Sequence, residues 1–280
     1  MKIISAIYKL SRPLNCSITF ITIVTACFIC GGGTDDLWQI LGGGVVGILV
    51  TATGNVINDY YDIEADRINR PYRVLPSEIV SPTIALLFFL LFNIAALLLA
   101  TILGFGPFII VAITVLLLYL YSYRLKNIPL VGNLVVAFLT GLAFVFGSVI
   151  VGNIFCGIIP ALFAFMINLM RELIKDIEDI DGDRVVDLST YPIKYGVVNS
   201  VNLVTIIGVA LIILTTLPFL FKIYDVKYFI LVMPIVNGIL VFVISRLRID
   251  PSKYNLKLAS NLLKLDMVLG IIAIILGSSF

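Results

Sequence analysis

Long apolar runs set the strongest limit on how this chain of 280 residues can fold. A helix that crosses a bilayer needs about 20 consecutive, mostly apolar residues. Charged residues make up only 13% of the chain, too few to cover the surface of a soluble domain, where about 25% is usual. We therefore expect an all-α membrane protein, with one domain over 1–280 and nine spanning helices near 14–31, 38–58, 82–103, 106–123, 130–151, 154–174, 197–220, 227–246 and 259–279.

The positions of the basic residues predict how the helices are oriented. Of the 19 Lys and Arg residues, all but Lys222 and Lys227 lie in the N-terminal segment or at 67–73, 124–126, 171–194 and 246–264, in or beside the connections after the second, fourth, sixth and eighth runs. Loops on the cytoplasmic side of a membrane are enriched in Lys and Arg. This distribution predicts a cytoplasmic N-terminus and an external C-terminus. Nearly all of the acidic residues lie on the same side, so we expect the chemistry to face the cytoplasm.

The first acidic motif follows the second apolar run. Asn58, Asp62 and Asp66 are spaced by four, which places them on one face of a continuing helix. The second motif follows the sixth run, where Asp176, Asp179 and Asp183 share a face with Glu172. Like charges at this spacing repel, so each array is destabilising unless a cation binds to it.

Two such acidic faces on the same side of the membrane favour a site for hard divalent cations over a pair of solvated charged helices. The chain has no histidine, so a bound metal must be held by oxygen ligands, which favours Mg²⁺. The expected ligands are Asn58, Asp62, Asp66, Asp176, Asp179 and Asp183. Mg²⁺ usually completes its coordination with water and phosphate oxygens. Neighbouring basic residues could bind the remaining phosphate oxygens, with Arg73 and Lys126 preferred: Arg67, Arg70, Arg73, Lys126, Lys175 and Arg184.

Two further patterns bear on the architecture. Asp62 and Asp66 repeat the spacing of Asp179 and Asp183, and each pair follows an even-numbered run, which predicts two similar four-helix halves plus one helix, with a cytoplasmic active-site cap. The four cysteines all fall in apolar stretches. No second C-x-x-C pair accompanies Cys27 and Cys30, so we expect buried thiols rather than a metal or redox site.

These motifs together resemble a known family. N-D-x-x-D-x-x-x-D at 58–66 with N-R-P at 69–71, and D-x-x-D-x-x-x-D at 176–183, are similar to the paired motifs of the UbiA superfamily of intramembrane prenyltransferases. The opening Leu10-Ser-Arg12-Pro13-Leu-Asn15 and the loop at 121–126 extend the resemblance along the chain. One departure is Asp187, which stands where relatives often have glycine before a threonine and proline.

The resemblance implies a function and further site residues. Within the superfamily, the stretches 63–77 and 175–184 look most like the archaeal digeranylgeranylglyceryl phosphate synthases. These transfer a geranylgeranyl group from its diphosphate to geranylgeranylglyceryl phosphate in ether-lipid synthesis. The implied catalytic residues are Asp62, Asp66, Asp179 and Asp183. Arg12 would join the phosphate-binding residues, and Asn15, Tyr61 and Tyr121 would line the substrate pocket.

The implied partners are an isoprenyl diphosphate donor, a prenylated glycerol phosphate acceptor and membrane lipid, with no nucleic acid. The alternative within the family is an aromatic acceptor, as in quinone biosynthesis. A cation-coupled transporter is a more distant alternative, because it would favour isolated acids near the bilayer midplane over acids clustered at helix ends.

Overall fold

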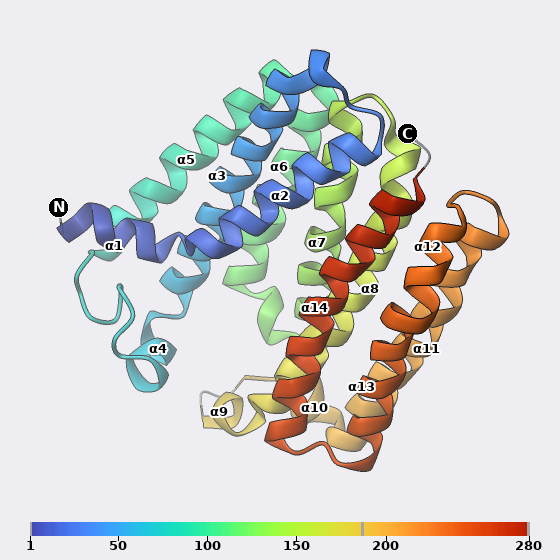
Figure 1. Ribbon diagram of the computed structural model, residues 1–280. Coiled ribbons are helices and arrows are strands. Elements are labelled where there is room, and N and C mark those ends of the chain that lie inside the picture. Colours follow the sequence, from blue (N-terminus) through green and yellow to red (C-terminus); the bar gives the residue numbers. More distant parts are fainter. Residues whose placement is uncertain (1, 186–187, 279–280) are drawn as a thin grey trace. The chain divides into compact units, whose positions relative to one another are not determined.

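The computed structural model describes residues 2–185 and 188–278, with the side chains of residues 2, 3, 68 and 69 left out. Within these ranges every regular element is a helix (Figure 1). The longer ones are α2 (Pro13–Ile29), α3 (Leu37–Tyr61), α5 (Pro82–Leu103), α6 (Phe105–Tyr123), α7 (Val131–Ile150), α8 (Ile154–Glu178), α11 (Val197–Leu220), α13 (Asn237–Ile249) and α14 (Lys253–Gly277). The all-α prediction is confirmed.

Eight helices in the described part of the chain are long and apolar enough to cross a membrane, or nine if one bent pair counts as a single span. The bent pair comprises α1 (Lys2–Leu10) and α2, which meet at 57° across Ser11 and Arg12. Arg12 has a left-handed backbone with φ of 53°, and Pro13 begins the next helix. Proline is well suited to the first position of a helix because its missing N–H would have no partner there. The other eight spans overlap the predicted runs.

The chain divides into two compact units. The first unit comprises Met1–Lys126 and Leu142–Ile158, and α3 is its central helix, packed against α2, α5 and α6. Its core holds Ile40, Val46 and Val50 of α3 with partners from the surrounding helices. Gly147 of α7 permits close helix packing, since a Cβ atom there would lie 2.7 Å from the carbonyl oxygen of Ile23.

The polar end of α3 is covered by nearby segments of the same unit. Ala6 and Leu10 of α1 form a small core with Val56 of α3, and Leu75 and Val80 of the 70–81 connection join it. The short helix α4 (Ile63–Asn69) directly follows α3. The sequence motif at 58–66 therefore lies beneath an ordered layer rather than in an open loop.

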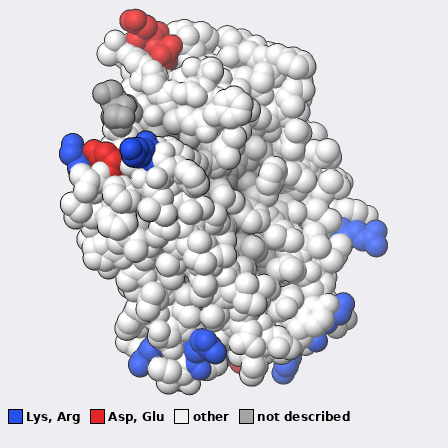
Figure 2. Space-filling model, turned by 90° about the vertical axis from the view of Figure 1, so that its right-hand side faces the viewer, with Lys and Arg blue, Asp and Glu red and all other residues white. Residues whose placement is uncertain are grey.

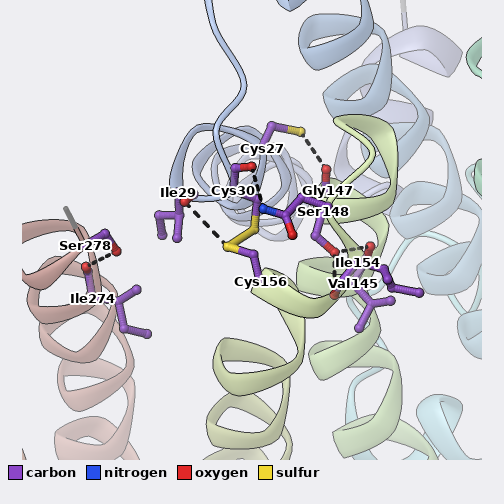
Figure 3. Close-up of a disulfide and its surroundings, with 11 residues drawn as sticks. Cys27, Ile29, Cys30, Val145, Gly147, Ser148, Ile154, Cys156, Ile274 and Ser278 are labelled. Carbon is purple, nitrogen blue, oxygen red and sulfur yellow. Dashed lines mark hydrogen bonds between the residues drawn. A yellow bond between two sulfur atoms is a disulfide. The ribbon is translucent and has the colours of Figure 1, made fainter. Parts of the chain in front are cut away.

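The cysteines depart from the expectation of four buried thiols. Cys16 and Cys27 are buried and free as expected, but Cys30 and Cys156 form a disulfide (Figure 3). Cys27 donates instead to the carbonyl oxygen of Gly147 at 3.2 Å. The disulfide joins the end of α2 to the start of α8. The sequence prediction was wrong here because Cys30 and Cys156 are 126 residues apart and only the fold brings them together.

The second unit comprises Asn127–Gly141 and Ile159–Phe280. Its core contains Leu173, Ile174 and Ile177 of α8 with residues from α11, α13 and α14. The span 226–249 is interrupted by a π-helical turn at Val232–Val236, which joins α12 (Val226–Leu231) to α13. Pro234 lies in this turn and has no N–H to donate, which favours a local widening of the helix.

The outer surface of the helices is apolar, as a protein in a bilayer requires. Many large hydrophobic side chains are exposed on the spans, including Leu98 at 61% and Ile206 at 66%. Charged side chains are sparse on the face in Figure 2, and most of them lie toward its edges. The protein is therefore an integral, multi-pass membrane protein.

Candidate active site

The two acidic motifs have the same local backbone. The first is interrupted at Asp62, between α3 and α4, and the second at Asp179, between α8 and α9 (Ile180–Val185). Helical hydrogen bonds nevertheless continue across both interruptions. The N–H of Asp66 donates to the carbonyl of Asp62 at 2.7 Å, and the N–H of Asp183 donates to that of Asp179 at 3.0 Å. Each aspartate pair thus keeps the one-turn spacing that places both side chains on one face.

Asp62 lies at the centre of the first cluster. Its carboxylate accepts one hydrogen bond from the ammonium of Lys126 and another from the amide of Asn58 at 2.8 Å. Lys126 comes from the short 3₁₀ turn Leu125–Asn127 that follows α6, 64 residues away in the chain. The fold thereby brings together three residues that the sequence assigned to metal and phosphate binding.

A second group of charges joins Asp66 to the N-terminal segment. Arg73 donates to Asp66 at 2.6 Å and to Asp59 at 3.2 Å, and Arg12 also pairs with Asp59. Asp59 and Asp66 are 5% and 6% exposed, so each carboxylate needs a partner to offset its desolvation. The left-handed backbone at Arg12 places its guanidinium beside this group. The predicted residues Arg12, Asp66 and Arg73 therefore belong to one network.

Tyrosines lie beside the first cluster. The hydroxyl groups of Tyr61 and Tyr119 are 3.3 Å apart, and the Tyr61 ring also contacts those of Tyr60 and Tyr123 with edge-on geometry. Tyr121, also predicted to line the pocket, is half-buried on α6. The electron-rich faces of such rings can stabilise a cation by about 1–2 kcal/mol.

Three predicted residues lie outside these contacts. Arg67 pairs with Glu64 at 2.9 Å and Glu78 at 3.6 Å on the exposed side of α4. Arg70 is exposed and has no ion pair among the described residues. Asn15 is exposed on the first turn of α2. The structure does not bring these three side chains onto the carboxylates. The side chain of Asn69 in the N-R-P motif, and Asp187 after the second motif, lie outside the part that the structure describes.

The second cluster lies in the second unit. The carboxylate of Asp176 accepts a hydrogen bond from Asn133 of α7 at 2.8 Å. Asp179 is exposed, and Asp183 is half-buried one turn further on. Burial and the nearby charge of Asp179 raise the pKa of Asp183 to about 6. Lys175 turns to Glu172 at 2.9 Å rather than to an aspartate.

Both clusters suit Mg²⁺ by their donor chemistry. Every candidate ligand offers oxygen, which is what Mg²⁺ prefers. Burial and, second, the charge of Asp179 raise the pKa of Asp183, and a bound cation would offset both. No three acidic, histidine or cysteine side chains within 2–185 and 188–278 are already gathered as a metal site. In the first cluster, the positive charges of Lys126 and Arg73 neutralise the carboxylates of Asp62 and Asp66.

Sequence reasoning missed two residues of these clusters. Asp59 was passed over because it lies off the four-residue spacing, although a carboxylate directly at the end of an apolar run was itself a signal. Asn133 was not considered because nothing in its local pattern links it to Asp176, 43 residues away.

Comparison with known proteins identifies the family. A model described as the UbiA prenyltransferase family matches residues 19–265. The chain belongs to this family. A digeranylgeranylglyceryl phosphate synthase of Methanopyrus kandleri is 36% identical over 96% of this chain and 97% of its own, and one of Methanosphaera stadtmanae is 35% identical over 96% and 98%. The resemblance read from the motifs is confirmed, and the protein is a prenyltransferase.

Solved structures agree with the family fold. One structure, described as giving structural and mechanistic insights into digeranylgeranylglyceryl phosphate synthase in membranes, is 33% identical and superposes with a TM-score of 0.87 over 99% of both chains. A UbiA homologue from Archaeoglobus fulgidus bound to DMAPP and Mg²⁺ is 18% identical, with a TM-score of 0.68 over 96% of this chain and 98% of its own. The predicted fold class is thus confirmed.

Proposed function

We propose that this protein transfers a geranylgeranyl group from geranylgeranyl diphosphate to the free hydroxyl of geranylgeranylglyceryl phosphate. The product is digeranylgeranylglyceryl phosphate, for ether-lipid synthesis. The observation that carries the proposal is the similarity to synthases of that name, at 36% identity over 96% of the chain for the M. kandleri protein. The oxygen-rich clusters and their cationic neighbours support it.

In this reaction the bond between the allylic carbon and the diphosphate oxygen breaks, and its electron pair leaves with diphosphate. A new bond forms between that carbon and the acceptor oxygen, and the hydroxyl proton is released. Bound Mg²⁺ would supply charge neutralisation for the leaving diphosphate. The ligands we propose for Mg²⁺ are Asn58, Asp62 and Asp66 in the first unit and Asp176, Asp179 and Asp183 in the second.

We assign the cationic side chains to the phosphate oxygens. Lys126 and Arg73 contact carboxylates that we propose as Mg²⁺ ligands, so each lies close to where the diphosphate would bind. Arg12 belongs to the same network through Asp59. Their preorganised N–H groups would stabilise charge that develops as the leaving group departs. The rings of Tyr61 and its neighbours would face the allylic cation.

We also propose that the whole chain works as one domain, with the N-terminus and both clusters on the cytoplasmic side. The distribution of Lys and Arg supports this orientation. The disulfide supports it independently, since Cys30 and Cys156 lie at helix ends that this orientation places outside, where oxidising conditions preserve disulfides.

The test is a competition between acceptors. The purified protein in lipid nanodiscs would be given geranylgeranyl diphosphate, Mg²⁺, geranylgeranylglyceryl phosphate and 4-hydroxybenzoate together, and the products separated by mass spectrometry. The expected product is the diether phosphate, and its formation should stop with EDTA and resume when Mg²⁺ is restored. Prenylation of the aromatic acid alone would reject the proposed acceptor and leave the prenyltransferase assignment standing.

A further inference from the structure

A group of cations in the second unit lies apart from the aspartates. Arg171 and Lys175 of α8 both contact Glu172, at 2.8 and 2.9 Å. Lys264 of α14 lies within electrostatic range of Arg171, Lys175, Glu172 and Glu178. Two features place α8 and α14 side by side. Leu173 and Ile174 share a core with Leu256 and Leu263, and Lys253 at the start of α14 pairs with Asp181, just beyond α8, at 2.9 Å.

These cations still have unused donors. Glu172 accepts from both Arg171 and Lys175 through the same oxygen. The Nε of Arg171 is buried without a hydrogen-bond partner in the described structure. Lys264 forms no ion pair or hydrogen bond with any residue that the structure describes. The buried N–H of Arg171 and the ammonium of Lys264 therefore lack a hydrogen-bond acceptor among the described residues. A buried donor without an acceptor lowers the stability of the fold, so we expect a ligand to accept a hydrogen bond from it.

The depth of these cations in the spans indicates what kind of anion that is. Arg171 lies seven residues before the end of α8, which is about 10 Å along the helix. Lys264 lies five residues inside the predicted run 259–279, about 8 Å along α14. Ionisable residues inside spanning helices are functional as a rule. Near these ends of the runs, a phosphate attached to a prenyl chain can reach the cations while its chain remains in apolar surroundings.

We propose that Arg171, Lys175 and Lys264 form a binding site for the phosphomonoester of the acceptor lipid. Such a group carries a charge of about −1.5 to −2 at neutral pH and has three acceptor oxygens, which match the free donors of these cations. Without the phosphate, the carboxylate of Glu172 forms ion pairs with Arg171 and Lys175. The site begins one helical turn before Asp176 on the same helix, so the glycerol hydroxyl of the bound acceptor lies near the second aspartate cluster. This inference rests on the proposed function, which supplies the acceptor.

The first experiment measures preference for the phosphate. Turnover of geranylgeranylglyceryl phosphate is compared with that of the same alcohol without its phosphate, at saturating geranylgeranyl diphosphate. Lys264→Gln should lower the ratio of the two kcat/KM values about tenfold, as expected for one lost charge-assisted hydrogen bond, with the KM for the donor substrate unchanged. Lys264→Arg should largely restore the ratio. Lys257→Gln, an exposed lysine on the same helix nearer its start, is the matched control and should leave the ratio as in the wild type.

A second experiment measures binding without chemistry. Calorimetry in nanodiscs, with no diphosphate donor, would titrate the acceptor into the wild type, Lys264→Gln and Lys257→Gln. The acceptor should bind the wild type and Lys257→Gln alike and bind Lys264→Gln about tenfold more weakly. Equal competition by inorganic phosphate or by anionic bilayer lipid would overturn the proposed ligand.

The two experiments separate this inference from the proposed function. Wild-type turnover of the acceptor with an unchanged preference ratio in both Lys264→Gln and Lys175→Gln would overturn the phosphate site alone. Absence of turnover in the wild type would reject the proposed function. In that case the calorimetry still decides the site, because weaker binding by Lys264→Gln than by Lys257→Gln supports it and equal binding contradicts it.

Discussion

Arg73 forms ion pairs with two buried carboxylates beside the first cluster. A single Nη atom donates to both Asp59 and Asp66, whose side chains are 7% and 9% exposed. Two buried carboxylates so close together repel each other, and a guanidinium between them turns the repulsion into attraction. Replacement of Arg73 leaves Asp66 without this cation and Asp59 with Arg12 alone.

We therefore expect Arg73→Ala to lower the free energy of unfolding by about 3 kcal/mol, the usual cost of removing one partner from a buried ion pair. Thermal unfolding in detergent, followed by circular dichroism, would measure it. Arg67→Ala is the matched control, because its partner Glu64 is 82% exposed and such pairs contribute about 0.5 kcal/mol or less. Equal destabilisation by the two variants would contradict the network.

Asp183 gives a prediction for pH. Its pKa of about 6 lies above the ordinary value for an aspartate, so its proton competes with a metal ion as the pH approaches 6. Metal binding is strongest well above pH 6 and weakens as the pH falls through 6. The Mg²⁺ concentration for half-maximal turnover should therefore rise about tenfold between pH 7 and pH 5. Because Asp183 is itself a proposed catalytic ligand, Asp183→Asn is compared with the wild type by calorimetric Mg²⁺ binding rather than by turnover. The rise should be smaller in the variant, and an identical rise in both proteins would assign the titration to another group.

At the scale of the elements, each acidic motif combines a helix break with unbroken hydrogen bonding. The helices end beside Asp62 and Asp179, yet the backbone bonds keep Asp66 and Asp183 one turn further along. This arrangement lets a spanning helix present two carboxylates at its end without extending the span itself. The same construction at both motifs agrees with the repeat predicted from the D-x-x-x-D spacing.

The Cys30–Cys156 disulfide is the covalent link between α2 and α8, and it yields a prediction at this scale. Alkylation of the unfolded protein without reductant should label two thiols, Cys16 and Cys27, and labelling of four would contradict the pairing. Cys30→Ser should lower stability by about 2–4 kcal/mol, because the cross-link restricts the unfolded chain. Cys16→Ser is the control and should cost less, since a serine can still donate to the carbonyl of Ser11, as Cys16 does.

For the whole molecule, the orientation in the membrane can be tested by labelling. The native cysteines are buried or paired, so a single introduced cysteine is the accessible one. Ser81→Cys and Asn127→Cys should react only with a reagent on the cytoplasmic side, and Lys227→Cys only with an external one. Lys227 is preferable to Asp225, whose side chain caps α12 through the backbone N–H of Lys227 at 2.7 Å. Labelling of all three from one side would refute the proposed topology.

Much of the architecture could be predicted because the local composition of a segment largely determines whether it spans a membrane. Runs near 82–103 and 197–220 coincide with α5 and α11, since a spanning helix satisfies its own backbone and needs only apolar length. The first span was harder to predict: Arg12 bends the chain between α1 and α2, and α2 alone has only 17 residues. Its left-handed backbone is stabilised in the folded protein by contacts such as the pair with Asp59, which no local pattern reveals.

Sequence alone determined the all-helical membrane fold, the two aspartate motifs and the oxygen-only chemistry, because each depends on residue type and on spacing within a few turns. Only the tertiary structure decided which cation meets which carboxylate. Lys126 reaches Asp62 across 64 residues, Arg12 reaches Asp59 across 47, and Arg67 turns away to Glu64. Long basic side chains have many possible partners, and the choice among them depends on where the backbone places each one and on how deeply each carboxylate is buried. That information belongs to the packed chain, not to any segment of it.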